Sequence, residues 1–141
     1  MKTYADTSFF VSLYLRDNHT PAALRRLRLN PRLWLTPFHR LEFIHALGQN
    51  VFRRQISAAQ AEAIHQDLSR DCDAGVWLTV DFPAAAFATG VELARRHVPA
   101  VGTRTLDILH VACALELKAE RFWTFDERQR KLARAAGLRT A

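Results

Sequence analysis

The sequence predicts an α/β fold with a mostly parallel sheet. Short apolar stretches typical of strands alternate with longer stretches of helical periodicity, a pattern characteristic of parallel strands joined by helices. The strand candidates are Thr3–Ala5, Leu33–Thr36, Val76–Val80, Arg121–Phe125 and Leu138–Thr140. The 141 residues contain no internal repeat, low-complexity segment or linker, so we expect a single domain over residues 1–141.

Two helices are expected before the second strand. The first begins at Thr7 or Ser8, directly after the acid that ends the first strand. Its expected inner face is Phe10, Leu13 and Tyr14. The second begins at Thr20-Pro21, with Thr as the N-cap and Pro at the first helical position, and it ends before Pro31.

The next two helices have clear start signals. Pro37 opens a helix that runs to about Phe52. Its apolar residues recur at three- and four-residue steps, which predicts that this face is core. The residues of that face are Phe38, Leu41, Ile44, Leu47 and Val51. Ser57 and Gln60 fit a capping box, so a helix should follow to about Arg70.

Three helices are expected in the last third of the chain. Pro83 begins one that ends before Pro99. Its expected inner face is Phe87, Val91 and Ala94. An apolar helix follows from Thr105 to about Leu117, and the last helix, Glu127–Ala136, ends at Gly137 as its C-cap.

Composition and cysteine content favour a globular protein of the cytoplasm. Apolar residues make up 49% and charged residues 24% of the chain, as in folded domains. No apolar run reaches the about 18 residues that a membrane helix needs, and the N-terminus lacks an export signal. Cys72 and Cys113 have no paired spacing, so we expect small buried thiols without a disulfide in a reducing compartment.

The chain is basic, with 20 Lys and Arg against 14 Asp and Glu and a net charge of +6. The only lysines are Lys2, Lys118 and Lys131, so most of the positive charge is arginine. Arginine binds phosphate through two parallel N–H donors, which suggests nucleic acid or an acidic protein as partner. An arginine-rich composition with solvated helix faces is the equally good alternative.

Two acids follow strand candidates directly: Asp6 and Asp126. The carboxyl ends of parallel strands lie on one edge of a sheet, where ligands bind in α/β proteins, so these carboxylates should converge. The alternative is that each caps the helix that follows, and Asp126-x-x-Gln129 resembles a capping pair. The two roles are compatible, because one carboxylate oxygen can accept a backbone N–H while the other faces an ion.

Two further acids lie within apolar helices. Asp107 is in the first turn of its helix, and a buried carboxylate costs several kcal/mol unless it is paired, hydrogen-bonded or metal-bound. An internal ion pair with Arg104 is its structural alternative. Glu42 borders the predicted core face of its helix, and its alternatives are water, Arg40 or His45.

A divalent cation would explain four converging carboxylates, which otherwise repel one another. Carboxylate oxygens suit Mg²⁺ or Mn²⁺. A common reaction at such a site is phosphodiester hydrolysis, in which the ion polarises the phosphoryl oxygen and activates a water molecule.

The ordered set of motifs resembles the PIN domain and, more narrowly, the VapC-type toxins of bacterial toxin–antitoxin pairs. The motifs are Asp6-Thr7-Ser8 after the first strand, Glu42 in a helix, Arg104-x-x-Asp107 leading into Ile-Leu-His-Val-Ala, and Thr124-Phe-Asp126-Glu-Arg. Each is weak alone, but together they follow in the family's order over residues 3 to about 138. The resemblance implies a three-layer α/β/α sandwich with four or five mostly parallel strands, the first of them central.

The resemblance also implies an endoribonuclease that requires Mg²⁺ or Mn²⁺. Asp6, Glu42, Asp107 and Asp126 would be the catalytic metal ligands. The supporting residues would be Ser8, Thr124 and Arg104, with Glu127 able to share the role of Asp126. The implied partners are an RNA substrate, a small antitoxin and a second copy in a homodimer.

Other functions fit less well or remain as alternatives. His39-x-x-Glu42-x-x-His45 lacks the i, i+4 histidine pair of the zincins, and no lysine is placed as a phosphorelay receiver needs. His110 is expected to be a satisfied helix residue rather than a general base. The alternatives that remain are a non-catalytic PIN-like binding module and a PIN nuclease of RNA processing outside a toxin–antitoxin pair.

Overall fold

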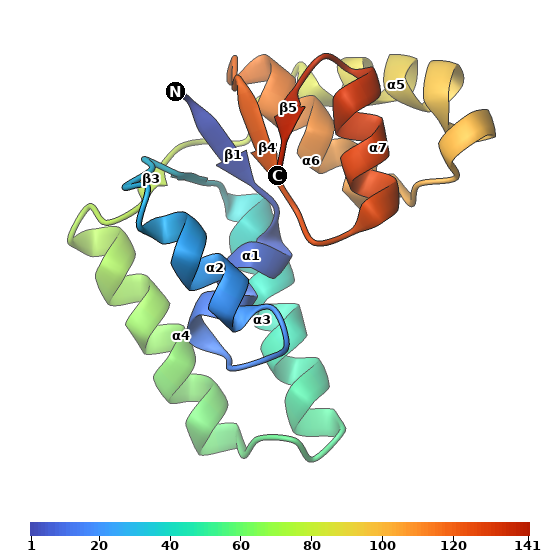
Figure 1. Ribbon diagram of the computed structural model, residues 1–141. Helices are drawn as coiled ribbons and strands as arrows, with labels where there is room; N and C mark the ends of the chain where they lie inside the picture. The colour runs from blue at the N-terminus through green and yellow to red at the C-terminus, as the bar shows by residue number, and fades with distance from the viewer. The chain divides into compact units, whose positions relative to one another are not determined.

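A computed structural model describes residues 1–141 as seven helices and five short strands (Figure 1). The strands are β1 (Thr3–Ala5), β2 (Trp34–Leu35), β3 (Leu78–Thr79), β4 (Arg121–Trp123) and β5 (Arg139–Thr140). The helices are α1 (Thr7–Tyr14), α2 (Thr20–Leu27), α3 (Pro37–Phe52), α4 (Ala58–Asp73), α5 (Ala86–Val101), α6 (Thr105–Glu116) and α7 (Glu127–Ala135). None of these helices is both long and apolar enough to cross a bilayer.

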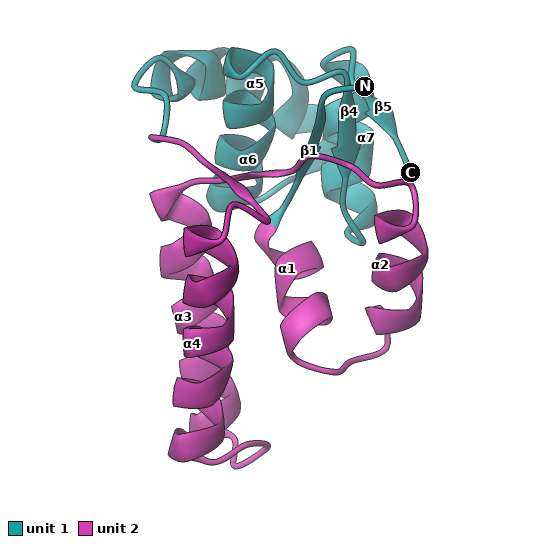
Figure 2. Ribbon diagram, turned by 90° about the vertical axis from the view of Figure 1, so that its left-hand side faces the viewer, with its two compact units in different colours: residues 1–6, 82–141 teal, residues 7–81 magenta.

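The chain divides into two compact units, which Figure 2 shows in different colours. Unit 1 comprises residues 1–6 and 82–141, and unit 2 comprises residues 7–81. All strand pairs are parallel, as predicted, but they form two sheets. The three-stranded sheet of unit 1 has the order β1-β4-β5, so β4 is its middle strand, and the two-stranded sheet of unit 2 is β2-β3.

Unit 1 is built on the pairing of β1 with β4. Ala5 lies opposite Trp123, and the ladder continues one step further because the Asp6 N–H donates to the Trp123 carbonyl at 3.1 Å. Tyr4 and Phe122 are fully buried and stack with ring centroids 5.5 Å apart. The two strands are therefore held by backbone pairing and by buried aromatic side chains, and Asp6 and Thr124 come directly after the strand ends.

Unit 2 has capped helices around an aromatic core. The Thr36 side chain caps α3 in a capping box with His39, and Ser57 caps α4 in the predicted box with Gln60. Phe10 of α1 makes edge-on ring contacts with both His39 and Trp77. The capping box leaves the buried His39 with a hydrogen-bond partner, which is why a histidine can occupy this core position.

The predicted core faces of α3 and α5 are wrong in most positions, although Leu47 of α3 is buried as predicted. In α3, Leu41 is 69% and Ile44 42% exposed, while the buried residues are His39, Phe43 and Leu47. In α5, Phe87 and Val91 are exposed, and the buried residues are Ala86, Gly90 and Leu93. Both helices carry apolar residues on more than one side, so periodicity alone does not identify the inner face. In α5 the buried face includes the small residues Ala86 and Gly90, because α6 lies close to this face. A Cβ at Gly90 would be in van der Waals contact with Ile108 Cγ2 of α6, at 3.7 Å.

Several helix ends differ from the prediction by a few residues. α5 starts at Ala86 rather than at Pro83, and it continues through Pro99 to Val101. Pro99 lies in the last turn, where it removes a single intrahelical hydrogen bond. The helix then ends at Gly102, whose φ of 70° is the left-handed conformation that glycine adopts without strain. The N-cap of α2 is His19 rather than Thr20.

Both cysteines are free and buried, as expected. Burial raises the pKa of Cys113 to about 11, opposed by a hydrogen bond with Tyr4 and assisted by the charge of Glu116. Burial also raises the pKa of Cys72, opposed by Arg40 and assisted by Asp73 and Asp71.

The buried thiols should be inert in the native protein. Because the thiolate is the reactive form and both pKa values are raised, neither cysteine should react with a thiol reagent such as DTNB at pH 8. Both should react once the chain is unfolded in guanidinium chloride. Rapid release of one equivalent of chromophore from native protein would contradict the burial of that cysteine.

The Tyr14 hydroxyl joins two elements of unit 2. It donates to Asp71 of α4 and accepts the Trp77 indole N–H at 2.8 Å. Burial raises the pKa of Tyr14 well above its usual value, and the bond to Asp71 adds to this effect. Tyr14 is therefore the neutral link between a carboxylate and an indole.

The Tyr14→Phe change should destabilise the protein. It leaves the Trp77 N–H and an Asp71 oxygen without their partner, at a cost of about 1–3 kcal/mol. Urea unfolding followed by tryptophan fluorescence should show a lower midpoint at an unchanged slope. An unchanged midpoint would mean that water replaces the hydroxyl without loss.

Candidate functional site

Two polar residues meet at the carboxyl edge of the unit 1 sheet. β1 is followed by Asp6 and β4 by Thr124, and because the strands are parallel neighbours these residues lie side by side. The Thr124 hydroxyl oxygen is 2.9 Å from Asp6 Oδ2, although the residues are 118 positions apart. Asp6 is only 5% exposed and Thr124 is fully buried. The ends of β1 and β4 are therefore adjacent in unit 1, and the residue that meets Asp6 there is Thr124. The convergence of the Asp6 and Asp126 carboxylates stays a prediction.

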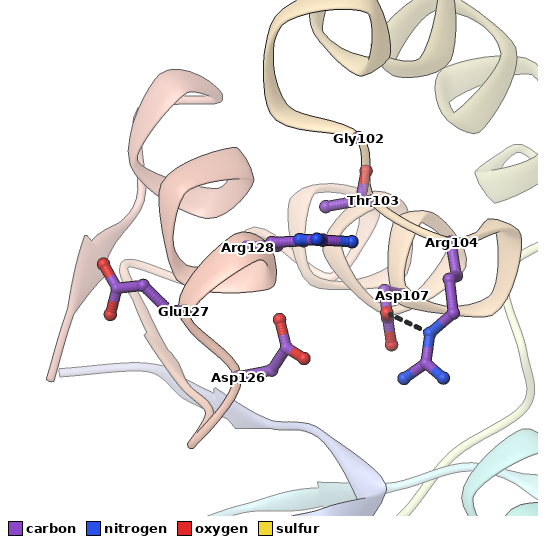
Figure 3. Close-up of a pocket in the computed structure, with 7 residues that line it drawn as sticks. All are labelled: Gly102, Thr103, Arg104, Asp107, Asp126, Glu127 and Arg128. Carbon is purple, nitrogen blue, oxygen red and sulfur yellow. Dashed lines mark hydrogen bonds and ion pairs between the residues drawn. The ribbon is translucent and has the colours of Figure 1, made fainter.

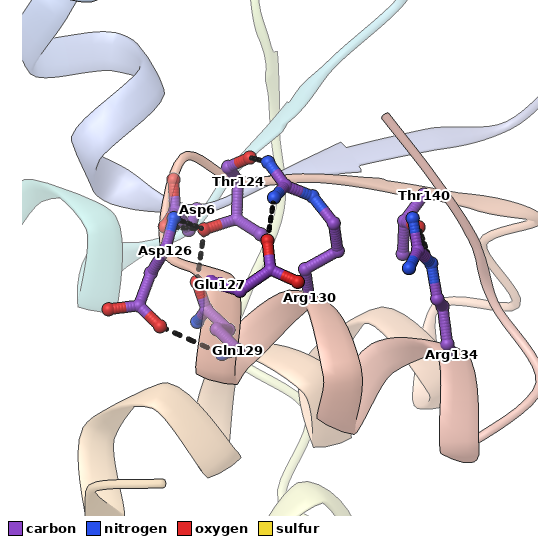
Figure 4. Close-up of polar contacts among 8 residues, drawn as sticks. All are labelled: Asp6, Thr124, Asp126, Glu127, Gln129, Arg130, Arg134 and Thr140. Atoms are coloured by element: carbon purple, nitrogen blue, oxygen red, sulfur yellow. Dashed lines mark hydrogen bonds and ion pairs between the residues drawn. The ribbon is translucent and has the colours of Figure 1, made fainter.

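Asp126 caps α7, as the capping alternative predicted. Its Oδ1 accepts the Gln129 backbone N–H at 2.8 Å, and its own N–H donates to Thr124 Oγ1 at 3.0 Å (Figure 4). The cap orients the Asp126 side chain and uses one of its two carboxylate oxygens. Capping therefore fixes this carboxylate without preventing it from binding a ligand.

Asp107 and Asp126 line one pocket of about 380 Å³ (Figure 3). The pocket is bounded by the start of α6, the start of α7 and the turn after α5. Its other lining residues are Gly102, Thr103, Arg104, Glu127 and Arg128. Unit 1 thus brings two predicted acids and the predicted Arg104 to one cavity.

The charge of Asp107 is poorly compensated. Burial raises its pKa and so does the negative charge of Asp126, while Arg104 and His110 oppose the rise without cancelling it. Arg104 Nε lies 3.4 Å from Asp107 Oδ2, but the Arg104 side chain is 82% exposed and Asp107 only 21%. The predicted ion pair exists on the surface rather than in the interior, where water screens it. Such a carboxylate favours a further cation.

Glu42 and Ser8 belong to unit 2. Glu42 accepts a hydrogen bond from Thr7 Oγ1 at 2.6 Å, and Thr7 directly follows Asp6 in the chain. Ser8 is exposed in the first turn of α1. The suggested partners of Glu42 bond elsewhere: Arg40 donates to Ser69, and His45 contacts Gln49.

His110 has the structural role that the sequence predicted. It is 2% exposed, and its Nδ1 is 2.8 Å from the Tyr4 hydroxyl in the core of unit 1. Both groups are thereby satisfied where water does not reach.

Sequence reasoning missed the contribution of α7. Gln129 is fully buried, Arg128 lines the pocket, and Arg130 donates to the Thr124 carbonyl at 2.9 Å while pairing with Glu127. A signal existed for Gln129, because it precedes the buried Leu132 and Ala133 by three and four positions and thus falls on the inner stripe of the helix. Arg128 is the last residue of the Thr124-Phe-Asp126-Glu-Arg motif, although that motif assigned it no role, and for Arg130 no comparable signal exists.

The carboxylate side chains of the pocket are the type of ligand that a hard divalent cation prefers. No group of three or more His, Cys, Asp or Glu side chains is arranged to enclose a metal ion. Mg²⁺ does not require one, because it keeps several waters and is usually held by one or two carboxylates together with substrate phosphates. The paired carboxylates of Asp107 and Asp126 beside two arginines meet that description.

These features define an α/β protein with an acidic pocket beside the carboxyl edge of a parallel sheet. The chain belongs to the PIN domain family, whose model matches residues 3–135. The predicted family and α/β class are thus confirmed. A comparison with curated protein sequences finds no match.

Three solved structures illustrate the similarity in fold. VapBC2 from Rickettsia felis, bound to a promoter DNA fragment, gives a TM-score of 0.68 at 17% identity, covering 100% of this chain and 98% of that one. VapC20 from Mycobacterium tuberculosis, a toxin that cleaves the sarcin-ricin loop, gives 0.68 at 20% identity, covering 97% and 96%. FitAcB from Neisseria gonorrhoeae gives 0.67 at 16% identity, covering 98% and 95%. At these identities the likeness establishes the fold.

The Asp107→Asn change should stabilise the metal-free protein. An acid whose pKa is raised by folding destabilises the folded state wherever it is ionised, so we expect a gain of about 1 kcal/mol at pH 7. The gain should vanish as the pH falls through the pKa of Asp107, because the wild-type carboxyl is then neutral as well. Urea midpoints with EDTA at pH 7 and pH 4 measure this difference.

The control is Asp73→Asn, which removes an exposed carboxylate of unit 2 and should change stability little. An Asp107→Asn protein less stable than wild type at pH 7 would contradict the assigned electrostatics.

Proposed function

We propose that the protein is a Mg²⁺- or Mn²⁺-dependent endoribonuclease and the toxin of a type II toxin–antitoxin pair, acting in the cytoplasm as one PIN domain. The observation that carries the proposal is the pocket of unit 1, where Asp107 and Asp126 lie beside Arg104 and Arg128. Carboxylates for a cation and guanidinium groups for phosphate are the two kinds of group that phosphodiester hydrolysis needs.

The chain's own residues divide the work. Asp107 and Asp126 would hold the cation at the pocket, and Asp6 would join them, since Thr124 bonds to both Asp6 and the Asp126 backbone. The cation, when bound, would polarise the phosphodiester and lower the pKa of the attacking water. Arg104 and Arg128 would hold the substrate phosphate.

Glu42 is proposed as the fourth acid, and Ser8 as a supporting hydroxyl. The support for Glu42 is its place in the family's motif order and its hydrogen bond to Thr7, the residue that follows Asp6. That bond holds the carboxylate in one orientation on α3. Ser8 lies in the same Asp6-Thr7-Ser8 motif and is exposed to solvent.

The partners follow from the same comparison. The similar structures include VapBC2 on a fragment of its promoter and VapC20, which is described as a toxin that cleaves the sarcin-ricin loop. By analogy we propose an RNA substrate, a small antitoxin and a homodimer. The net charge of +6 supports binding to the RNA backbone, and the acidic pocket would accept a basic side chain from an antitoxin.

A non-catalytic PIN-like binding module is the second candidate. The observation in its favour is that no three metal-binding side chains are already grouped. Metal titration separates the two functions, because a binding module needs no divalent cation to contact RNA.

The test of the proposed function is cleavage of total RNA with Mg²⁺ or Mn²⁺. EDTA should abolish cleavage, and Asp6→Asn should reduce its rate by about 100-fold or more while circular dichroism stays native, since a group that stabilises the transition state is lost. Asp73→Asn is the matched control and should cleave normally. Cleavage in EDTA, or full activity of folded Asp6→Asn, would refute the metal site.

A further inference from the structure

Gln129 holds an unusual position for a polar residue. It is fully buried on the inner stripe of α7, where an apolar side chain would pack without any hydrogen-bonding requirement. Burying an amide is unfavourable unless both of its ends find partners. Its contacts therefore explain why glutamine stands here.

The orientation of the Gln129 amide is fixed at one end. Nε2 donates to the backbone carbonyl of Asp107 at 3.2 Å, and a carbonyl can accept but not donate. The amide nitrogen must therefore face Asp107, which turns Oε1 toward Thr124. Oε1 lies 2.7 Å from Thr124 Oγ1 (Figure 4).

The Thr124 hydroxyl thus stands between two acceptors. Asp6 Oδ2 is 2.9 Å from Thr124 Oγ1 on one side, and Gln129 Oε1 is 2.7 Å away on the other. A hydroxyl has one proton, and the Asp126 N–H already occupies one of its lone pairs. When the proton points to Gln129, a Thr124 lone pair faces the Asp6 carboxylate, and this repulsion is relieved by positive charge at Asp6.

We propose that Gln129 is a positioning residue of the cation site: when a divalent cation binds Asp6 Oδ2, Gln129 Oε1 accepts the Thr124 hydroxyl proton that Asp6 otherwise accepts. Without Gln129, the hydroxyl donates to Asp6 instead and competes with the cation for that oxygen. The inference rests on the proposed function, because it takes Asp6 as a ligand. It adds a residue that does not itself touch the cation or the substrate.

The test compares Gln129→Met with Leu132→Met. Methionine matches glutamine in length and has no amide, while Leu132 is equally buried on α7, so both variants place methionine in the same helix. Mn²⁺ affinity is measured by electron paramagnetic resonance at a temperature where circular dichroism shows both proteins folded. Gln129→Met should weaken Mn²⁺ binding by about tenfold, the scale of losing a group that orients a ligand, and Leu132→Met by less than about twofold.

A double-mutant cycle with Thr124→Val tests whether Gln129 acts on Asp6 through the Thr124 hydroxyl. Valine has the shape of threonine without the hydroxyl, so in that background Gln129→Met should no longer change Mn²⁺ affinity by more than about twofold. Wild-type affinity in folded Gln129→Met, or an equal effect in both backgrounds, overturns the role of Gln129 and leaves the metal site standing. Absence of Mn²⁺ binding by the wild type overturns the proposed function and this inference together.

Discussion

The parallel pairing of β1 with β4 is the constraint on which the rest of unit 1 depends. It places Ala5 opposite Trp123, so the next residues, Asp6 and Thr124, emerge together at the same edge. A slip of one residue in either strand would turn the side chains of that strand to the other face of the sheet and would separate Asp6 from Thr124. The register is held by Tyr4 and Phe122, buried and stacked against each other, so apolar packing determines the position of the polar residues.

A series of polar contacts leads from the end of β4 to the start of α7 and then to the start of α6. Thr124 accepts the Asp126 N–H, and Asp126 caps α7. Gln129 of α7 then reaches the Asp107 carbonyl at the start of α6. Each contact orients the next segment that carries a carboxylate. The contacts that cap α7 are therefore the same contacts that arrange the acids. Capping and ligand binding, which look like alternatives for Asp126 in the sequence, require different oxygens of one side chain.

The sequence was sufficient where a local signal coincides with the tertiary role. Pro37 and Ser57 mark helix starts by their own chemistry, and the end of β1 before Asp6 follows from a short apolar run. The last strand before α7 was predicted to end at Phe125, but β4 ends at Trp123, so Thr124 rather than Asp126 follows it. It was insufficient where the environment chooses between similar faces. In α3 and α5 the apolar residues surround much of the helix, and only the neighbours decide that Phe43 is buried while Leu41 is not. The strand order, with β4 in the middle of three, likewise depends on pairings between distant segments.

Asp107 is placed where its negative charge is unfavourable, because burial and the charge of Asp126 raise its pKa. Its carboxylate is half-buried near Asp126, and the exposed Arg104 compensates it only in part. A sequence selected for folding alone would place asparagine or an apolar residue there. The same imbalance appears around Thr124, where one proton serves two acceptors. Arginines lie near both places, with Arg104 and Arg128 at the pocket and Arg130 on the Thr124 carbonyl. The imbalance therefore arises from how the acids are grouped and not from the net charge of the chain, which is +6. If Asp6, Asp107 and Asp126 share a cation, as proposed above, its charge would offset the repulsion at both places and so link the electrostatics of the pocket to the hydrogen bonds around Thr124.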